Sequence, residues 1–127
     1  MREHLFLMLA IASGCSATFH ALAATGWIAV DVASPVRHLV FVAINAGVGW
    51  YVIKRPLWLL PAYMVLVVQQ THGHGGRALR WWVNEGRVDV LSGAVLLALY
   101  GGLVLLVLDA RDRSPMIRRL LCRQRPA

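Results

Sequence analysis

Apolar stretches separated by short polar segments run along most of this chain. They cover about residues 5–30, 36–53, 57–72 and 88–108. A helix needs roughly 20 apolar residues to cross the hydrocarbon core of a bilayer, so the first and last stretches are long enough and the middle two fall slightly short. The pattern therefore predicts an all-α integral membrane protein, with four transmembrane helices in an antiparallel bundle with short loops.

The composition supports this class and limits the domain organisation. Of the 127 residues, 58% are hydrophobic and only 15% are charged, which is too apolar for an ordinary soluble domain. The chain is also too short for two membrane domains. We predict one four-span membrane bundle over residues 1–110 and a basic cytoplasmic tail over residues 111–127.

The basic residues are distributed unequally between the two sides of the predicted membrane. With four spans both termini share one side, and nine of the 13 Lys and Arg residues fall there, against four on the other side. Because Lys and Arg collect in the cytoplasmic segments beside spans, both termini are predicted to be cytoplasmic, in a bacterial-type cytoplasmic membrane. The net charge of +7 then reflects topology, and no nucleic-acid partner is expected.

Two segments are predicted to lie at the membrane surface. Thr71–Gly76 is rich in glycine, which predicts a flexible connection, and Arg77–Val83 is predicted to form a short interfacial segment with Trp81 and Trp82 at headgroup level. Beyond Pro115, apolar and basic residues alternate at helical spacing, which indicates an amphipathic tail on anionic lipid. The lipid-surface residues of this tail are predicted to be Arg118, Arg119, Arg123 and Arg125.

Small residues at helical spacing predict close contacts between helices. Gly14, Thr18, Ala21 and Thr25 share one face of the first span, on which another helix can approach closely. Spans two and four offer further such faces at Gly47, Gly49, Gly93, Gly101 and Gly102. The expected partners are therefore membrane lipid and either another membrane protein or a second copy of this chain.

Polar residues inside apolar spans are costly to bury and therefore mark candidate sites, which here concentrate in the outer half of the membrane. One hypothesis is an amphiphilic ligand such as a quinone or lipid, because polar side chains there could bind its head while the spans hold its tail. Its candidate ligand-binding residues are His20, Asn45, Gln70 and Arg77.

A second hypothesis is a metal ion, because imidazole and carboxylate suit zinc, copper or iron. Its candidate ligands are His38, His72, His74 and Asp89.

A third hypothesis is a b-type haem, which needs two imidazoles that face each other across helices. Only His72 or His74 would be available to pair with His20 from the third span. Without any ligand, His20 is expected to hydrogen-bond to a neighbouring helix, at Asn45, Gln69 or Gln70.

No complete catalytic or cofactor motif occurs in the chain. The serines lack an evident base with an orienting carboxylate, and Asp89 is expected simply to favour the start of its helix. The leading hypothesis is therefore a small non-enzymatic integral membrane protein, an accessory subunit or oligomeric module that packs against other membrane proteins. The alternative is a membrane protein that binds a metal, haem, quinone or lipid at a histidine-containing site in the outer half of the bilayer.

Overall fold

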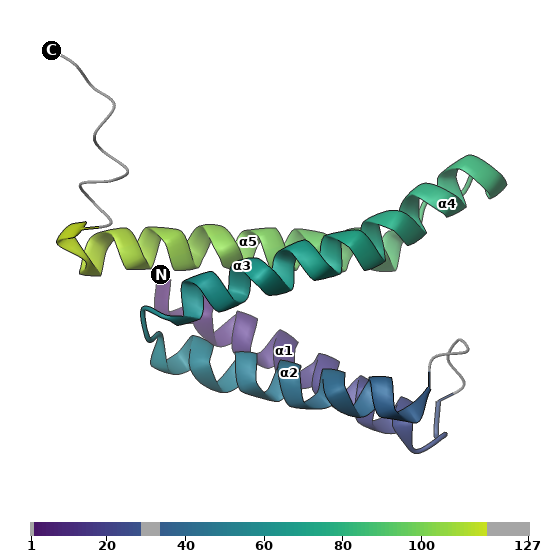
Figure 1. Ribbon diagram of the computed structural model, residues 1–127, viewed down its shortest axis with the longest axis horizontal. Coiled ribbons are helices and arrows are strands. Elements are labelled where there is room, and N and C mark those ends of the chain that lie inside the picture. Colours follow the sequence, from purple (N-terminus) through teal and green to yellow (C-terminus); the bar gives the residue numbers. More distant parts are fainter. Residues whose placement is uncertain (1, 29–33, 117–127) are drawn as a thin grey trace, which may run out of the picture. The chain divides into compact units, whose positions relative to one another are not determined.

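A computed structural model of the protein describes residues 2–28 and 34–116, and every element in these two ranges is a helix (Figure 1). In chain order these elements are α1 (Arg2–Ala24), α2 (Pro35–Lys54), α3 (Leu59–Gln70), the π-helical turn η1 (Thr71–Gly75), α4 (Gly76–Glu85) and α5 (Val90–Arg113). They belong to two compact units, residues 1–55 and residues 56–127. The all-α prediction is confirmed, and the single four-helix bundle over residues 1–110 stays a prediction.

Three of the helices in the described part of the chain are long and apolar enough to cross a membrane. These are α1 with 23 residues, α2 with 20 and α5 with 24. By itself α3 has 12 residues, about 18 Å of helix against a hydrocarbon core of about 30 Å. The structure thus supports residence in a membrane, whereas the crossing of the predicted span over residues 57–72 stays a prediction.

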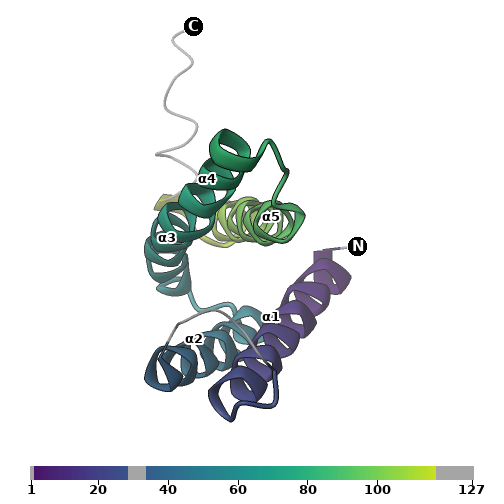
Figure 2. The ribbon, with the colours of Figure 1, turned by 90° about the vertical axis from the view of Figure 1, so that its right-hand side faces the viewer.

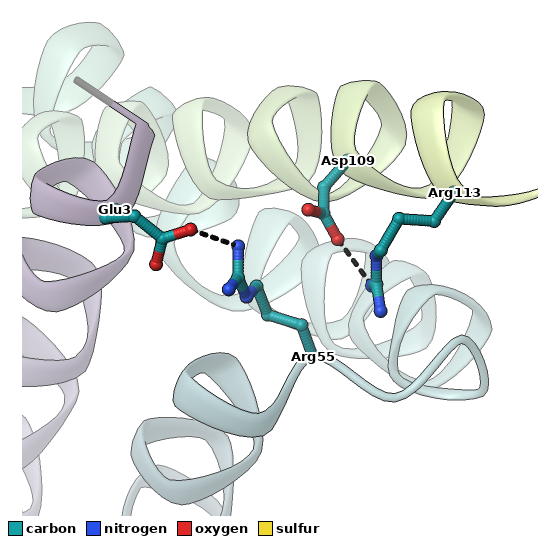
Figure 3. Close-up of polar contacts among 4 residues, drawn as sticks. All are labelled: Glu3, Arg55, Asp109 and Arg113. Carbon is teal, nitrogen blue, oxygen red and sulfur yellow. Dashed lines mark hydrogen bonds and ion pairs between the residues drawn. The ribbon is translucent and has the colours of Figure 1, made fainter.

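The first unit is an antiparallel hairpin of α1 and α2, which lie side by side in both views (Figures 1 and 2). At its open end Arg55 Nη1 lies 2.9 Å from Glu3 Oε1, and the two side chains point toward each other in Figure 3. Arg55 also caps α2, because its N–H donates to the carbonyl of Tyr51 at 2.7 Å while its backbone is left-handed, with φ of 51°. An ion pair this exposed contributes at most about 1 kcal/mol to stability. It therefore does more to fix which residues of the two helices lie opposite each other than to stabilise the hairpin.

The two helices of this hairpin approach each other closely at Gly49. A Cβ atom at that position would lie 3.4 Å from the carbonyl oxygen of Ala10 and 3.5 Å from Cβ of Ser13. The prediction of a close-contact face at this glycine is therefore confirmed. Phe6 and Val52 are both buried toward the open end of the same hairpin. Small residues at the crossing let the backbones approach, and the larger apolar residues fill the space beyond it.

The start of α2 follows from its sequence. Pro35 occupies the first turn of the helix, where its missing N–H costs no hydrogen bond. The hydroxyl of Ser34 accepts from the N–H of Arg37 at 3.4 Å, as an N-cap does. The predicted start of the second span near residue 36 is confirmed.

The end of α1 differs from the prediction of a span over residues 5–30. Gly26 has φ of 76°, its N–H donates to the carbonyl of Ala23, and the N–H of Trp27 donates to the carbonyl of Leu22. This pair of bonds is a Schellman cap, which ends a helix with a left-handed residue, usually glycine. The helix therefore ends at Ala24, and apolar residues such as Trp27 and Ile28 lie beyond it.

The second unit pairs α3, η1 and α4 with α5. The hydroxyl groups of Thr71 and Tyr100 lie 2.9 Å apart, and His74 Nδ1 lies 3.1 Å from Ser92 Oγ, so the two arms run antiparallel. Buried residues on the facing sides include Tyr63, Val67 and Leu106. Figure 1 shows α4 rising away from α5 beyond this packed part.

The predicted flexible connection over Thr71–Gly76 is wrong, because η1 and the start of α4 continue the helix there. The hydroxyl of Thr71 donates to the carbonyl of Val67 at 2.7 Å, and the side-chain contacts to α5 hold the same segment from outside. The glycines alone favour flexibility, but these contacts and a wider π-helical turn keep the backbone helical.

The helix α5 begins at Val90, two residues after the predicted start of its span at residue 88, and runs five residues beyond the predicted end at residue 108. Asp89 is its N-cap, since Asp89 Oδ1 accepts from the N–H of Ser92 at 3.0 Å, which confirms the expected role of this carboxylate. At the other end Asp109 pairs with Arg113 one turn later (Figure 3). Basic residues in the last turn also suit the negative end of the helix dipole, which explains why α5 continues into the charged segment.

Candidate functional site

The structure brings together two histidines that the sequence had assigned to different sites. His20 on α1 and His38 on α2 face each other across the first hairpin, with their Nδ1 atoms 3.0 Å apart. His38 is buried, with 7% of its surface exposed, and His20 is half-buried. The ring of Phe41 stacks on His20 with centroids 5.0 Å apart, and Phe19 meets it edge-on at 5.5 Å. Apolar helices and aromatic rings thus surround the histidine pair, by which we mean His20 and His38.

The two rings point their Nδ1 atoms straight at each other. In a five-membered ring with bonds of about 1.33 Å, each atom lies roughly 1.1 Å from the centroid, so aligned nitrogens at this distance would put the centroids about 5.2 Å apart. The observed separation of the centroids is 5.3 Å. The two lone-pair directions are therefore nearly collinear, which is the geometry of an N–H···N hydrogen bond.

This alignment gives no support to a shared metal ion or to haem. Two imidazoles on one metal aim at a common point about 2.0–2.1 Å from each nitrogen, so their lone pairs converge at an angle. Axial haem ligands lie on opposite faces of the ring system, with nitrogens roughly 4 Å apart. Within residues 2–28 and 34–116, no group of three or more His, Cys, Asp or Glu side chains is placed to hold a metal ion.

The other ring nitrogen of His38 is the unusual atom of this site. Its Nε2 is buried and has no hydrogen-bond partner among the described residues. Whichever ring donates the Nδ1 hydrogen, His38 Nε2 is left with either an N–H without an acceptor or a lone pair without a donor. Leaving a buried polar atom without a hydrogen bond lowers the free energy of unfolding by about 1–3 kcal/mol. His38 Nε2 is therefore a destabilising group within the hairpin.

The remaining ligand candidates in the spans belong to different units of the fold. Asn45 Nδ2 donates to the carbonyl of Phe41 at 2.8 Å, within its own helix. His20 was expected to reach Asn45, Gln69 or Gln70, and the structure places its Nδ1 atom 3.0 Å from Nδ1 of His38. Gln70 is the half-buried last residue of α3, in the other unit.

A second polar cluster joins the end of the π-helical turn to the start of α5. Ser92 Oγ lies 2.6 Å from Asp89 Oδ2 and 3.1 Å from His74 Nδ1. An ionised carboxylate only accepts, so the serine hydroxyl donates to Asp89 and accepts the Nδ1 hydrogen of His74. This order leaves the lone pair of a neutral His74 on Nε2.

The charge state of this cluster follows from its hydrogen bonds and from the position of His74, which lies beyond the predicted span over residues 57–72. Asp89 accepts two hydrogen bonds from Ser92, one from the backbone N–H and one from the hydroxyl, and both favour its ionised form. Burial lowers the pKa of His74, and the nearby Arg77 lowers it further, while Asp89 opposes both effects. At neutral pH the cluster therefore consists of a carboxylate, a hydroxyl and a neutral imidazole.

This cluster is not arranged for nucleophilic catalysis. In a catalytic triad the histidine stands between the serine and the carboxylate, whereas here the serine stands between the other two. Ser92 is also 1% exposed, so a substrate cannot reach its oxygen. The cluster instead ties η1 to α5.

Of the other predicted site residues in the described part of the chain, His72 joins neither cluster, whereas Arg77 lies near the second cluster and its charge acts on His74 and Asp89. His72 is exposed and stands two residues from His74, a spacing at which helical side chains do not face each other. Arg77 is exposed on α4. The predicted lipid-surface residues Arg118, Arg119, Arg123 and Arg125 lie outside the described residues.

The sequence did contain a signal for the histidine pair. His20 and His38 stand nine residues before and nine residues after position 29, in the middle of the connection between the two helices. Glu3 and Arg55 are symmetric about the same position. Residues equally far from the turn of an antiparallel hairpin lie opposite each other, so this count would have paired both sets.

Comparison with known proteins gives this chain no relative from which a role could be transferred. No protein-family model, no curated protein and no solved structure matches it. Any function must therefore be argued from the two hairpins and their polar contacts.

Proposed function

We propose that this chain is a small non-enzymatic integral membrane protein that works as an accessory subunit or oligomeric module. In this proposal it packs against another membrane protein or a second copy of itself. The observation that supports it most directly is an open apolar groove along α1, referred to below as the α1 groove. It is lined by Ile11, Gly14, Cys15, Thr18, Phe19, Leu22 and Ile28.

The α1 groove lies on the side of the helix that α2 does not cover. The residues of α1 nearest α2 include Phe6, Ser13 and His20, and the groove residues project from the opposite side of the helical wheel. A Cβ atom at Gly14 would have no other atom within 4 Å. In a bilayer such a small-residue face lets a further helix approach closely and gain dispersion contacts that lipid chains fill less well.

The proposal includes four spans with both termini in the cytoplasm of a bacterial-type cell. The helical path from α3 through η1 to α4 covers 27 residues, from Leu59 to Glu85, which is about 40 Å and more than a bilayer core requires. The apolar stretch over residues 57–72, which includes α3 and the start of η1, is proposed as the third span, and α4 is proposed to lie at the outer interface. The unequal distribution of Lys and Arg supports this orientation.

Cross-linking from Cys15 tests the packing proposal, because this exposed thiol lies in the α1 groove. In a Cys122→Ser background, a short bis-maleimide applied to native membranes is expected to give one adduct of defined mass, either a dimer or a complex with one other protein. The matched control, Cys15→Ser with Ala12→Cys, moves the thiol to the flank of the groove and is expected to react much less. Equal reaction at both positions, or a monomer in both cases, would reject the proposal.

A second candidate function is favoured by the unpartnered His38 Nε2. A quinone or lipid whose polar head supplies a hydrogen-bond partner to this atom would remove its unfavourable burial. The test compares the quinone and lipid that co-purify with the wild-type chain and with the His38→Leu variant. Identical content in the two preparations would eliminate this candidate, and loss of one stoichiometric species would support it.

A further inference from the structure

The hydrogen bond inside the histidine pair has two possible directions, which leave different atoms on the outer side of each ring. A neutral imidazole has one N–H donor and one acceptor lone pair. With the two Nδ1 atoms 3.0 Å apart, one ring donates from Nδ1 and the other accepts there. Either direction gives one ring with its hydrogen on Nδ1 and one with its hydrogen on Nε2, so any intrinsic preference of imidazole between these forms cancels. The surroundings of the rings therefore decide the direction.

The burial of His38 favours the direction in which His38 donates. If His20 donated, His38 would have its hydrogen on Nε2, which is buried and has no hydrogen-bond partner among the described residues. If His38 donates, the same Nε2 atom has a lone pair instead. Buried N–H groups without an acceptor are rarer in proteins than buried acceptors with an unused lone pair. His38 Nε2 is therefore a hydrogen-bond acceptor that lacks a donor.

The apolar surroundings limit the group that can supply this donor. The pair lies between two apolar helices, and the rings of Phe19 and Phe41 contact His20. A charged donor such as an ammonium group would lose its hydration there, which costs more than one hydrogen bond returns. A carbonyl or phosphodiester oxygen only accepts, so it would face the lone pair of His38 without forming a bond. A neutral hydroxyl group meets both conditions.

The position of His38 along α2 indicates that this hydroxyl belongs to an amphiphile. His38 stands four residues after the N-cap Ser34, about 6 Å along a helix that is long and apolar enough to cross a membrane. The ends of a spanning helix lie near the interface, so a polar head reaches this depth while its tail stays among the acyl chains.

We propose that His38 Nε2 binds the hydroxyl group of a membrane-dissolved amphiphile, of the quinol or diacylglycerol class, and discriminates against the corresponding carbonyl form. This inference rests on the second candidate function above, and it names the chemistry of the ligand. The selectivity follows from the direction of the hydrogen bond to His20, which leaves a lone pair on His38 Nε2 and no hydrogen.

NMR of the histidine ring nitrogens tests the first step. The full chain is labelled at these nitrogens and placed in nanodiscs without added ligand, and His38→Leu identifies the His38 signals. A ring nitrogen with a hydrogen and one with a lone pair have well-separated chemical shifts. We expect the hydrogen of His38 on Nδ1 and the lone pair on Nε2. The reverse arrangement would overturn the inference.

Addition of three probes under nitrogen tests the selectivity. These are decyl-benzoquinol, decyl-benzoquinone and dioleoylglycerol. We expect a hydroxyl probe to move the His38 Nε2 signal and to bind roughly tenfold more tightly than the quinone, because only the hydroxyl forms the hydrogen bond. Saturation by the quinol alone would identify a phenolic ligand, and saturation by dioleoylglycerol would identify an aliphatic one.

Two variants separate this site from general effects of the probes. His20→Leu removes the acceptor of the His38 Nδ1 hydrogen and is expected to reduce the preference for the hydroxyl probe. His72→Leu, which changes an exposed histidine on η1, is expected to keep it. Equal or tighter binding of the quinone would overturn this inference alone, whereas a His38 signal that no probe moves would also reject the second candidate function.

Discussion

Single residues decide how polar groups are accommodated inside the first hairpin. His38 is almost fully buried, and its Nδ1 atom shares a hydrogen bond with His20. Removing one histidine leaves the ring nitrogen of the other without a hydrogen bond in an apolar environment. Replacing both histidines by apolar residues removes the unsatisfied polar group and its free-energy cost. The two histidines should therefore be strongly coupled in their effect on stability.

A double-mutant cycle measures this coupling. His38→Leu is expected to lower the free energy of unfolding in mixed micelles by about 1–3 kcal/mol, and addition of His20→Leu is expected to restore part of it, with a coupling of about 0.5–1.5 kcal/mol. The pair His20→Leu and Asn45→Leu is the control, because Asn45 bonds within its own helix. A coupling near zero for the histidine pair would show that the hydrogen bond does not stabilise the hairpin.

The second residue-scale prediction concerns pH. Folding buries His74 and lowers its pKa below the usual 6.5. Below that pH the unfolded chain binds more protons than the folded chain, so the stability of the second hairpin is expected to fall as the pH is lowered through this window.

Unfolding of the wild type and two variants at about pH 7.5 and about pH 5.5 tests this dependence. His74→Gln is expected to reduce the loss of stability on acidification. His72→Gln, an exposed histidine two residues away, is expected to leave the loss unchanged. If both variants retained the full pH dependence, a different group would have to be responsible.

At the scale of the elements, the sequence predicted helix starts better than helix ends and connections. Ser34 with Pro35 and Asp89 with Ser92 act through local bonds, so the starts of α2 and α5 could be found from the residues alone. The end of α1 at Gly26 requires a backbone conformation that the apolar pattern does not report. The π-helical turn was missed because contacts with α5 maintain it.

The crossing of α1 and α2 provides an element-scale prediction. Gly49→Leu is expected to destabilise the first hairpin by about 1–3 kcal/mol, because the side chain would press on Ala10 and Ser13. Gly47→Leu is the matched control, since a Cβ atom there has no other atom within 4 Å. Chemical unfolding of both variants in the same detergent compares the two, and equal losses would contradict the close approach at Gly49.

At the scale of the whole molecule, the topology depends on whether the third apolar segment crosses the membrane. With Cys15 and Cys122 replaced by serine, Asn84→Cys is expected to react with a membrane-impermeant maleimide in intact cells. Leu57→Cys is expected to react only after permeabilisation, because one span separates the two positions. Reaction of both cysteines from the same side would show that residues 57–72 do not cross.

The sequence by itself determined the helical class, the local caps and three of the four predicted spans as helices long and apolar enough to cross a membrane, because helix length, hydrophobicity and capping are properties of adjacent residues. Of the candidate site, it supplied the polar residues inside the spans, and it assigned His20 and His38 to different hypotheses. Only the tertiary structure decided that His20 meets His38, that Ser92 links His74 to Asp89, and that Gly49 lies at a helix crossing. Those contacts depend on the register between two helices, which the periodicity within one helix does not specify.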